Sequence, residues 1–190
     1  LRLQDPPRPP GERQVCVSYA WKDERSKDPD RAGKVERFCH DLAKVKIKVT
    51  RDTTDLGLGD RLTGFMRTVA SGDVVFVFLS DAYLKSPNCM YELLLIWQGC
   101  RDNADEFLKQ IRVFPVANVE IHTIAARLKY AAYWVTERDT IRSIIDKSGV
   151  DVLGETDLRQ FHRIQDFAHK VSDILGLISD KLLAGDFDEF

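Results

Sequence analysis

The chain has 190 residues, of which 44% are hydrophobic, and this is enough to bury the core of one domain. Charged residues make up 31% of the chain and the formal net charge is -2, so there is no basic block long enough to follow a phosphate backbone, and nucleic acid is excluded as an expected direct partner. No apolar run approaches the roughly 18 residues of a membrane span and no signal peptide leads the chain, which predicts a cytoplasmic protein without a membrane partner.

The cysteines indicate the same compartment. All four lie inside apolar strand or helix patterns and none has C-x-x-C spacing, which favours reduced thiols over disulfides or a zinc site. We therefore expect no bound metal. The four residues are Cys16, Cys39, Cys89 and Cys100.

The first residues of the chain differ from the rest in composition. Residues 5–11 read DPPRPPG, which is too rich in proline for a helix or a central strand. We interpret residues 1–13 as an arm or linker, and residues 14–190 as one domain that includes a long C-terminal helix.

Two strands and one helix are predicted before the first glycine-rich loop. Residues 14–19 form a short β-rich run, and the polar loop that follows, residues 20–31, carries one conspicuous aromatic side chain, Trp21. Apolar residues then recur at helical spacing over residues 35–42. Residues 45–49 alternate valine and isoleucine with lysine, a pattern that protects a sheet edge, so this second strand is predicted to lie outermost, beside the first.

The middle of the domain contains its most apolar strand. Residues 51–60 hold two glycines and are predicted to form a loop that leads into a helix over residues 62–69. Residues 74–79 (VVFVFL) form an unbroken apolar run, which is typical of a parallel strand covered on both faces. Residues 111–117 are predicted to be the fourth strand, with a bulge or a loss of pairing at Pro115 because proline has no N–H to donate.

Glu92 lies on the helix between the third and fourth strands. Ser86 and Pro87 supply a hydroxyl N-cap and a proline at the first helical position, so the helix is predicted to start there and to continue over residues 88–97. Glu92 is then on the second turn, at helical spacing from Ser86 and Cys89, and its carboxylate leaves from a mostly apolar surface. This position favours a perturbed carboxylate.

The C-terminal third is predicted to contain one further strand among helices. Thr136 with Asp139 resembles a capping box, and Gly149 is the expected end of the helix that this box opens. The predicted elements are a helical turn at residues 105–108, a short helix over 121–128, a fifth strand over 131–135, a helix over 136–147 and one long helix over 157–183.

Five strands separated by helical segments predict an α/β fold with a parallel, doubly wound sheet, and an edge position for the second strand fits the flavodoxin-like order 2-1-3-4-5. Ligands of such sheets bind at the carboxyl ends of the strands. The sequence contains neither G-x-G-x-x-G after the first strand nor a phosphate loop, so both common nucleotide cradles are excluded. Asp81 ends the third strand as a phosphoacceptor of a receiver domain would, but such a domain needs an acidic pair after strand one and a lysine after strand five, and the predicted fifth strand ends in Val135-Thr136.

Three motifs together resemble a TIR (Toll/interleukin receptor) domain. They are Val17-Ser18-Tyr19-Ala20 on the first strand, residues 52–59 as the second loop, and the S-x-x-C-x-x-E pattern that ends at Glu92. The resemblance covers residues 14–135 and the final helix, and it is greater to the bacterial, NAD-cleaving branch than to the animal receptor adaptors. The chain departs from many enzymatic relatives at Asn88, where they have tryptophan, and Trp21 could substitute for that aromatic wall. The segment of residues 136–156 is also longer than the corresponding segment of most family members.

The resemblance implies that the chain is an NAD+ nucleosidase, with NAD as the substrate and no cofactor. Glu92 would be the catalytic residue, engaging the ribose that bears nicotinamide. The resemblance places further residues around the substrate, namely Tyr19, Ala20, Trp21, Gly57 and Ser86.

The resemblance also implies self-association through TIR–TIR contacts of the second loop, including Asp52, Leu56 and Leu58. The chain would then act as the effector of an immune or cell-death system, with an unidentified sensor domain or partner protein. The alternative interpretation is a non-catalytic TIR scaffold that signals only through homotypic TIR–TIR interaction.

Cleavage of the nicotinamide glycosidic bond of NAD is compatible with a single catalytic glutamate. Glycosidases usually pair two carboxylates because one must protonate the leaving oxygen, whereas nicotinamide leaves NAD from a cationic pyridinium and needs no proton. Glu92 could therefore bind the ribose hydroxyls and stabilise the developing oxocarbenium ion. Cys89 is interpreted as a small packing residue, because no histidine lies near it in the sequence.

Overall fold

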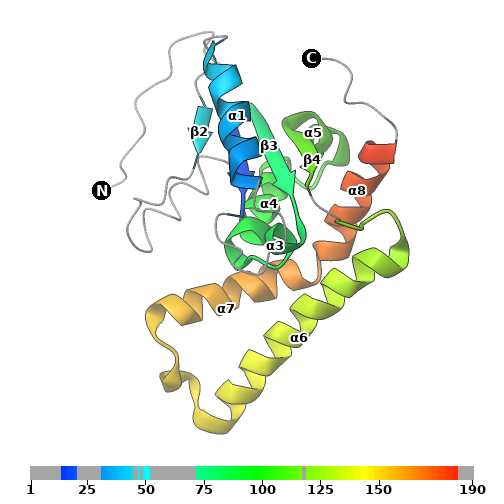
Figure 1. The fold of residues 1–190 in the computed structure, drawn as a ribbon. Helices are drawn as coiled ribbons and strands as arrows, with labels where there is room; N and C mark the ends of the chain where they lie inside the picture. The colour runs from blue at the N-terminus through cyan, green and yellow to red at the C-terminus, as the bar shows by residue number, and fades with distance from the viewer. Residues whose placement is uncertain are drawn as a thin grey trace.

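A computed structural model describes residues 14–20, 31–44, 47, 49–51, 72–116 and 119–183 (Figure 1). The strands are β1 (Val15–Tyr19), β2 (Val49–Arg51), β3 (Val74–Leu79) and β4 (Ile111–Pro115). The helices are α1 (Arg31–Lys44), α3 (Asp81–Leu84), α4 (Pro87–Gly99), α5 (Ala104–Gln110), α6 (Ile124–Ser148), the 3-10 helix η1 (Val150–Val152), α7 (Glu155–Ala168) and α8 (Val171–Leu183).

The described strands form one parallel sheet in the order β2-β1-β3-β4. The predicted α/β class and the first four positions of the order 2-1-3-4-5 are therefore confirmed. β3 is buried from Val75 to Leu79, because both of its neighbours are strands and both of its faces are covered. The second strand occupies the predicted edge, but it spans Val49–Arg51, later in the chain than the expected residues 45–49.

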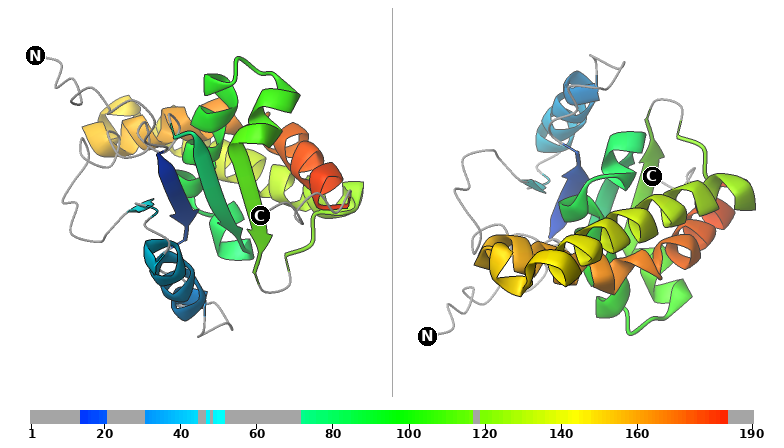
Figure 2. Two further views of the ribbon diagram at one scale, coloured as in Figure 1. Left: turned by 90° about the horizontal axis from the view of Figure 1, so that it is seen from above. Right: turned by 90° about the horizontal axis from the view of Figure 1, so that it is seen from below.

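Alternating residues of the central strands enter two separate cores. Phe76 and Phe78 pack with Val35 of α1 on one face of the sheet, whereas Val75 and Val77 pack on the other face with residues of α4, α7 and α8. Figure 2 shows α1 on one side of the sheet and α7 and α8 on the other. Helices on both faces define a doubly wound sheet.

The predicted fifth strand is wrong. Residues 131–135 lie in the middle of α6, which also replaces the two helices expected on either side. A five-residue apolar run fits a strand or a helix equally well. The helix forms because Tyr130 and Trp134, four residues apart, bury one face and because no glycine or proline interrupts residues 119–148.

The ends of α6 test the predicted caps. The Thr123 side chain accepts a hydrogen bond from the Ala126 amide and starts the helix. Thr136 is therefore not an N-cap, and its hydroxyl instead donates to the Ala132 carbonyl within the helix at 2.9 Å. Gly149 ends the helix as predicted, with a positive φ of 83° that a side chain rarely permits.

The long C-terminal helix predicted over residues 157–183 is two helices. α7 ends at Ala168 and α8 begins at Val171, with the Lys170 amide bonded to the Phe167 carbonyl at the break. The apolar period continues through the break, and no glycine or proline marks it, so the sequence pattern does not reveal it. The predicted helical turn at residues 105–108 is the short helix α5, which is capped by the Asn103 side chain.

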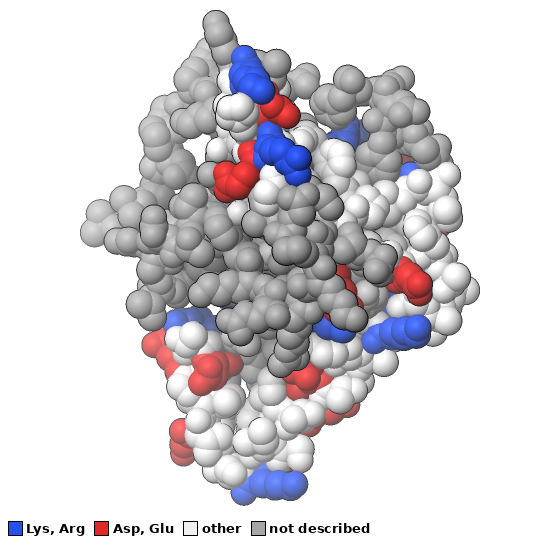
Figure 3. All heavy atoms as spheres, viewed as in Figure 1, with Lys and Arg blue, Asp and Glu red and all other residues white. Residues whose placement is uncertain are grey.

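α6, η1 and the start of α7 form a helical arm that extends away from the sheet (Figure 1). On the face drawn in Figure 3, the exposed acidic and basic side chains are interspersed rather than gathered, so the described part of this face presents no extended field of one sign. Within the described ranges, no helix is both long and apolar enough to cross a membrane.

Candidate functional site around Glu92

The start of α4 determines where Glu92 lies. Ser86 has an extended backbone, its side chain accepts a hydrogen bond from the Cys89 amide at 3.4 Å, and Pro87 follows at the first helical position. The predicted cap is therefore confirmed. Glu92 is on the second turn, and only 5% of its surface is exposed. The other buried residues of this helix are apolar, so Glu92 is the one charged residue among them.

The Glu92 carboxylate accepts a hydrogen bond from a side chain of β1. The buried Ser18 hydroxyl donates to Glu92 Oε2 at 2.5 Å, which is within the range of a short charge-assisted hydrogen bond. Ser18 lies near the carboxyl end of β1, opposite Val77 of β3. The carboxylate is thus near the carboxyl ends of the strands, where α/β folds bind their ligands.

Tyr83 of α3 completes a chain of hydroxyl groups. Its Oη is 3.0 Å from Ser18 Oγ. Ser18 has one hydroxyl hydrogen, so when Ser18 donates that hydrogen to an ionised Glu92, Tyr83 is the donor in its contact with Ser18. The chain therefore runs from Tyr83 through Ser18 to Glu92, and each hydroxyl donates toward the carboxylate.

Burial keeps Tyr83 in its donor form. Its side chain is fully enclosed, and burial raises the pKa of Tyr83 well above its ordinary value of 10.0, with further increases from Cys89 and Glu92. The phenol is neutral at physiological pH. α3 itself begins at Ser80, whose side chain accepts from the Tyr83 amide at 3.1 Å.

The structure separates the site residues that the resemblance implied. Ala20 lies in the same buried cluster as Cys89, whereas the Tyr19 ring packs in the cluster on the α1 face of the sheet, away from the Ser18 side of β1. Ser86 is half-buried and caps α4. The implied pocket residues Trp21 and Gly57, and the implied contact residues Asp52, Leu56 and Leu58, lie outside the described residues.

Sequence reasoning missed Ser18 and Tyr83 as site residues. A signal for Ser18 was present, since it is the one small aliphatic hydroxyl in the apolar run VCVSY and alternation places it on the face of β1 opposite Tyr19. Tyr83 gave no such signal, because the one-turn helix that carries it was not predicted.

Two other candidates have structural explanations. Cys89 is 6% exposed within the apolar core, as expected for a packing residue. Asp81 forms an ion pair with Lys85 at 2.9 Å and accepts from the Tyr130 hydroxyl at 3.1 Å. In the part of the chain that the structure describes, no group of three or more His, Cys, Asp or Glu side chains is arranged to hold a metal ion.

The family follows from a comparison with known domains. A family model described as TIR domain matches residues 15–145, which include β1, Glu92 and most of α6. The chain belongs to the TIR domain family. A comparison with curated proteins gave no match to it. The described sheet, α4 with its Ser86 cap, and Glu92 thus lie within a TIR domain, and α7 and α8 follow the matched segment.

Proposed function

We propose that this TIR domain is an NAD+ nucleosidase, with Glu92 as its catalytic residue. The observation that carries the proposal is the buried Glu92 carboxylate, held by the Ser18 hydroxyl near the carboxyl end of β1. The TIR family includes NAD-cleaving members, and the branch that the sequence motifs resemble has a glutamate at the place of Glu92.

Folding alone does not account for this carboxylate. A charged group in an apolar interior costs free energy unless it is paired or hydrogen-bonded, and leucine or methionine would pack the same helix face without that cost. Buried titratable groups with specific hydrogen-bond partners are characteristic of functional sites. The burial of Glu92 with the Ser18 and Tyr83 hydroxyls therefore supports a chemical role.

The proposed reaction breaks the bond between the ribose C1′ and the pyridinium nitrogen of NAD. The bonding electrons move to that nitrogen and release neutral nicotinamide, so no general acid is required. The positive charge that develops on the ribose is stabilised by the negative charge of Glu92. Water, or the adenine ring of the same molecule, then bonds to C1′ and loses a proton, giving linear or cyclic ADP-ribose.

Ser18 and Tyr83 fix the carboxylate before the substrate arrives. Donors that already point at a charge need no reorganisation during the reaction, and such pre-organised groups are a main source of electrostatic catalysis. The Ser18 hydroxyl occupies one lone pair of Oε2 and restrains the rotation of the Glu92 side chain. The same carboxylate is the group that would accept hydrogen bonds from the ribose hydroxyls of the substrate.

The proposal includes activation by self-association, with a role as effector in an immune or cell-death system. The loop residues Asp52, Leu56 and Leu58 would contribute to TIR–TIR contacts. NAD cleavage per molecule is then expected to rise with concentration. The experiment that tests the function must therefore use concentrated or artificially clustered domain.

The test compares nicotinamide release from NAD by the clustered wild-type domain and by Glu92→Gln, which keeps the side-chain volume and removes the charge. We expect a loss of roughly a hundredfold or more. The matched control is Glu106→Gln, an exposed helical glutamate paired with Lys109, which should stay within about threefold of wild type. A wild-type domain that releases no nicotinamide, or a Glu92→Gln variant with full turnover, would support the non-catalytic scaffold instead.

A further inference from the structure

The helix α3 lies between the Glu92 site and α6. It has four residues, too few for a helix to be stable by itself, so contacts with the rest of the protein must determine its position. One of these residues is Tyr83, the first donor in the hydroxyl chain to Glu92. Whatever holds α3 therefore also holds that donor.

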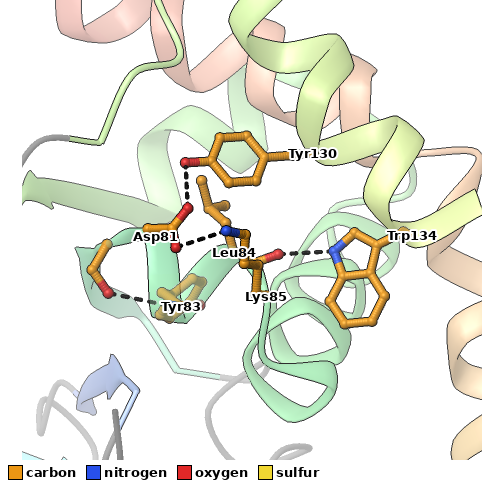
Figure 4. Close-up of polar contacts among 7 residues, drawn as sticks. Asp81, Tyr83, Leu84, Lys85, Tyr130 and Trp134 are labelled. Atoms are coloured by element: carbon orange, nitrogen blue, oxygen red, sulfur yellow. Dashed lines mark hydrogen bonds and ion pairs between the residues drawn. The ribbon is translucent and has the colours of Figure 1, made fainter. Parts of the chain in front are cut away.

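α6 binds the C-terminal end of α3. The indole N–H of Trp134 donates to the Leu84 carbonyl at 2.8 Å (Figure 4). Leu84 is the last residue of α3, and carbonyl groups in the last turn of a helix have no partner within the helix. Trp134 is 1% exposed and packs edge-on against Phe167 of α7, with ring centroids 4.7 Å apart. The donor is thus rigidly placed.

α6 also binds the N-terminal end of α3. The Tyr130 hydroxyl donates to Oδ1 of Asp81, the first residue of α3, at 3.1 Å. Burial and the neighbouring carboxylate of Asp81 raise the pKa of Tyr130, so its hydroxyl keeps the proton that it donates. Tyr130 and Trp134 are four residues apart and share one face of α6, and Figure 4 shows both reaching α3 from that helix.

We infer that Trp134 and Tyr130 are positioning residues for Glu92, acting through α3, Tyr83 and Ser18. The inference rests on the proposed function for its effect on catalysis, but the coupling itself is a property of the structure. The α6 helix sets the position of α3, α3 sets the Tyr83 hydroxyl, and that hydroxyl orients the Ser18 donor on the carboxylate. A displacement of α6 is therefore transmitted to the proposed catalytic group.

The variants Trp134→Phe and Tyr130→Phe test the inference, since each keeps an aromatic ring and removes only the donor to α3. The matched control is Trp97→Phe. Trp97 is a buried tryptophan of α4 whose indole N–H has no hydrogen-bond partner among the described residues, so its replacement removes similar volume and no hydrogen bond. Tyr130→Phe is the milder change and carries the test if Trp134→Phe does not fold.

The first measurement does not depend on turnover. The Glu92 carboxyl signal is followed by carbon-13 NMR during a pH titration. Ser18→Ala should move its midpoint to higher pH by about one unit or more, because the lost donor favoured the charged form. Trp134→Phe and Tyr130→Phe should shift the midpoint in the same direction by a smaller amount, and Trp97→Phe should leave it unchanged. An unchanged midpoint in both folded α6 variants would overturn the inference.

The second measurement is steady-state NAD cleavage. Both α6 variants should lose about tenfold in kcat with little change in KM, because misplacing a catalytic group slows the chemical step without removing substrate contacts. A titration shift without any NAD cleavage by the wild type would retain the coupling and reject the nucleosidase function. An equal loss of kcat in Trp97→Phe would show a general loss of stability and contradict the positioning role.

Discussion

The site depends on residues that are distant in sequence but joined by single hydrogen bonds. The sequence motif predicted where Glu92 lies on its helix and that Ser86 caps it, since both follow from local spacing and capping chemistry. The bond between Ser18 and Glu92 could not be predicted in the same way, because it joins positions 74 apart. It depends on the register of β1 against β3 and on the tilt of α4, and no local pattern encodes either.

The buried tyrosines predict a specific loss of stability in alkali. Burial raises the pKa of both Tyr83 and Tyr130 above the ordinary value of 10.0. Above about pH 10 the unfolded chain therefore loses these protons while the folded protein keeps them. The folded state then binds more protons, so the free energy of unfolding falls as pH rises through this range.

Removing one of these phenols should make the free energy of unfolding fall less steeply as the pH rises above about 10. For Tyr83→Phe we expect the alkaline decline in unfolding free energy to be smaller by up to about 1.4 kcal/mol per pH unit. Urea unfolding at several pH values between about 9 and about 11 measures this slope. The same slope in wild type and variant would mean that Tyr83 ionises in the folded protein as readily as in the unfolded chain.

The elements were predicted well where the local pattern was unambiguous. Strands β1, β3 and β4, the edge position of β2, the capped start of α4 and the glycine stop of α6 all came from runs, caps and glycine placement, whereas the residues of β2 were predicted too early in the chain. α6 was divided wrongly because the apolar run of residues 131–135 is short enough for a strand. The alanines around it and the burial of Tyr130 and Trp134 on one face decide for a helix.

The two threonines of α6 give a direct test of this assignment. Thr123→Ala should lower the free energy of unfolding by about 1 kcal/mol, because its side chain caps the Ala126 amide at 3.1 Å. Thr136→Ala should change it by less than about 0.5 kcal/mol, because an exposed mid-helix position tolerates alanine well. Chemical denaturation of both variants measures the difference. The opposite order would place a helix start at Thr136, as the capping-box pattern suggested.

At the scale of the whole molecule, the doubly wound sheet places the candidate site residues near the carboxyl ends of its strands. β1 and α4 bring Ser18 and Glu92 together there, and α6 supports them from behind α3. The implied pocket residues Trp21 and Gly57 come from segments outside the described residues, so their roles remain predictions from the resemblance. The fold class was predictable because the apolar runs identify the strands, and the helical segments between these strands require a parallel sheet. The hydrogen-bonded chain was not, because it appears only when three elements pack.

The central claim is that Ser18 and Glu92 act as one catalytic unit, and a double-mutant cycle on NAD cleavage tests it most directly. A hydrogen bond to a charged group contributes about 1.5 to 3 kcal/mol, so Ser18→Ala should lower kcat by roughly 10- to 100-fold. The double variant Ser18→Ala with Glu92→Gln should be no slower than Glu92→Gln alone, because Ser18 has no function once the carboxylate is gone. Losses that multiply in the double variant, or single variants that turn over as fast as wild type, would contradict the account.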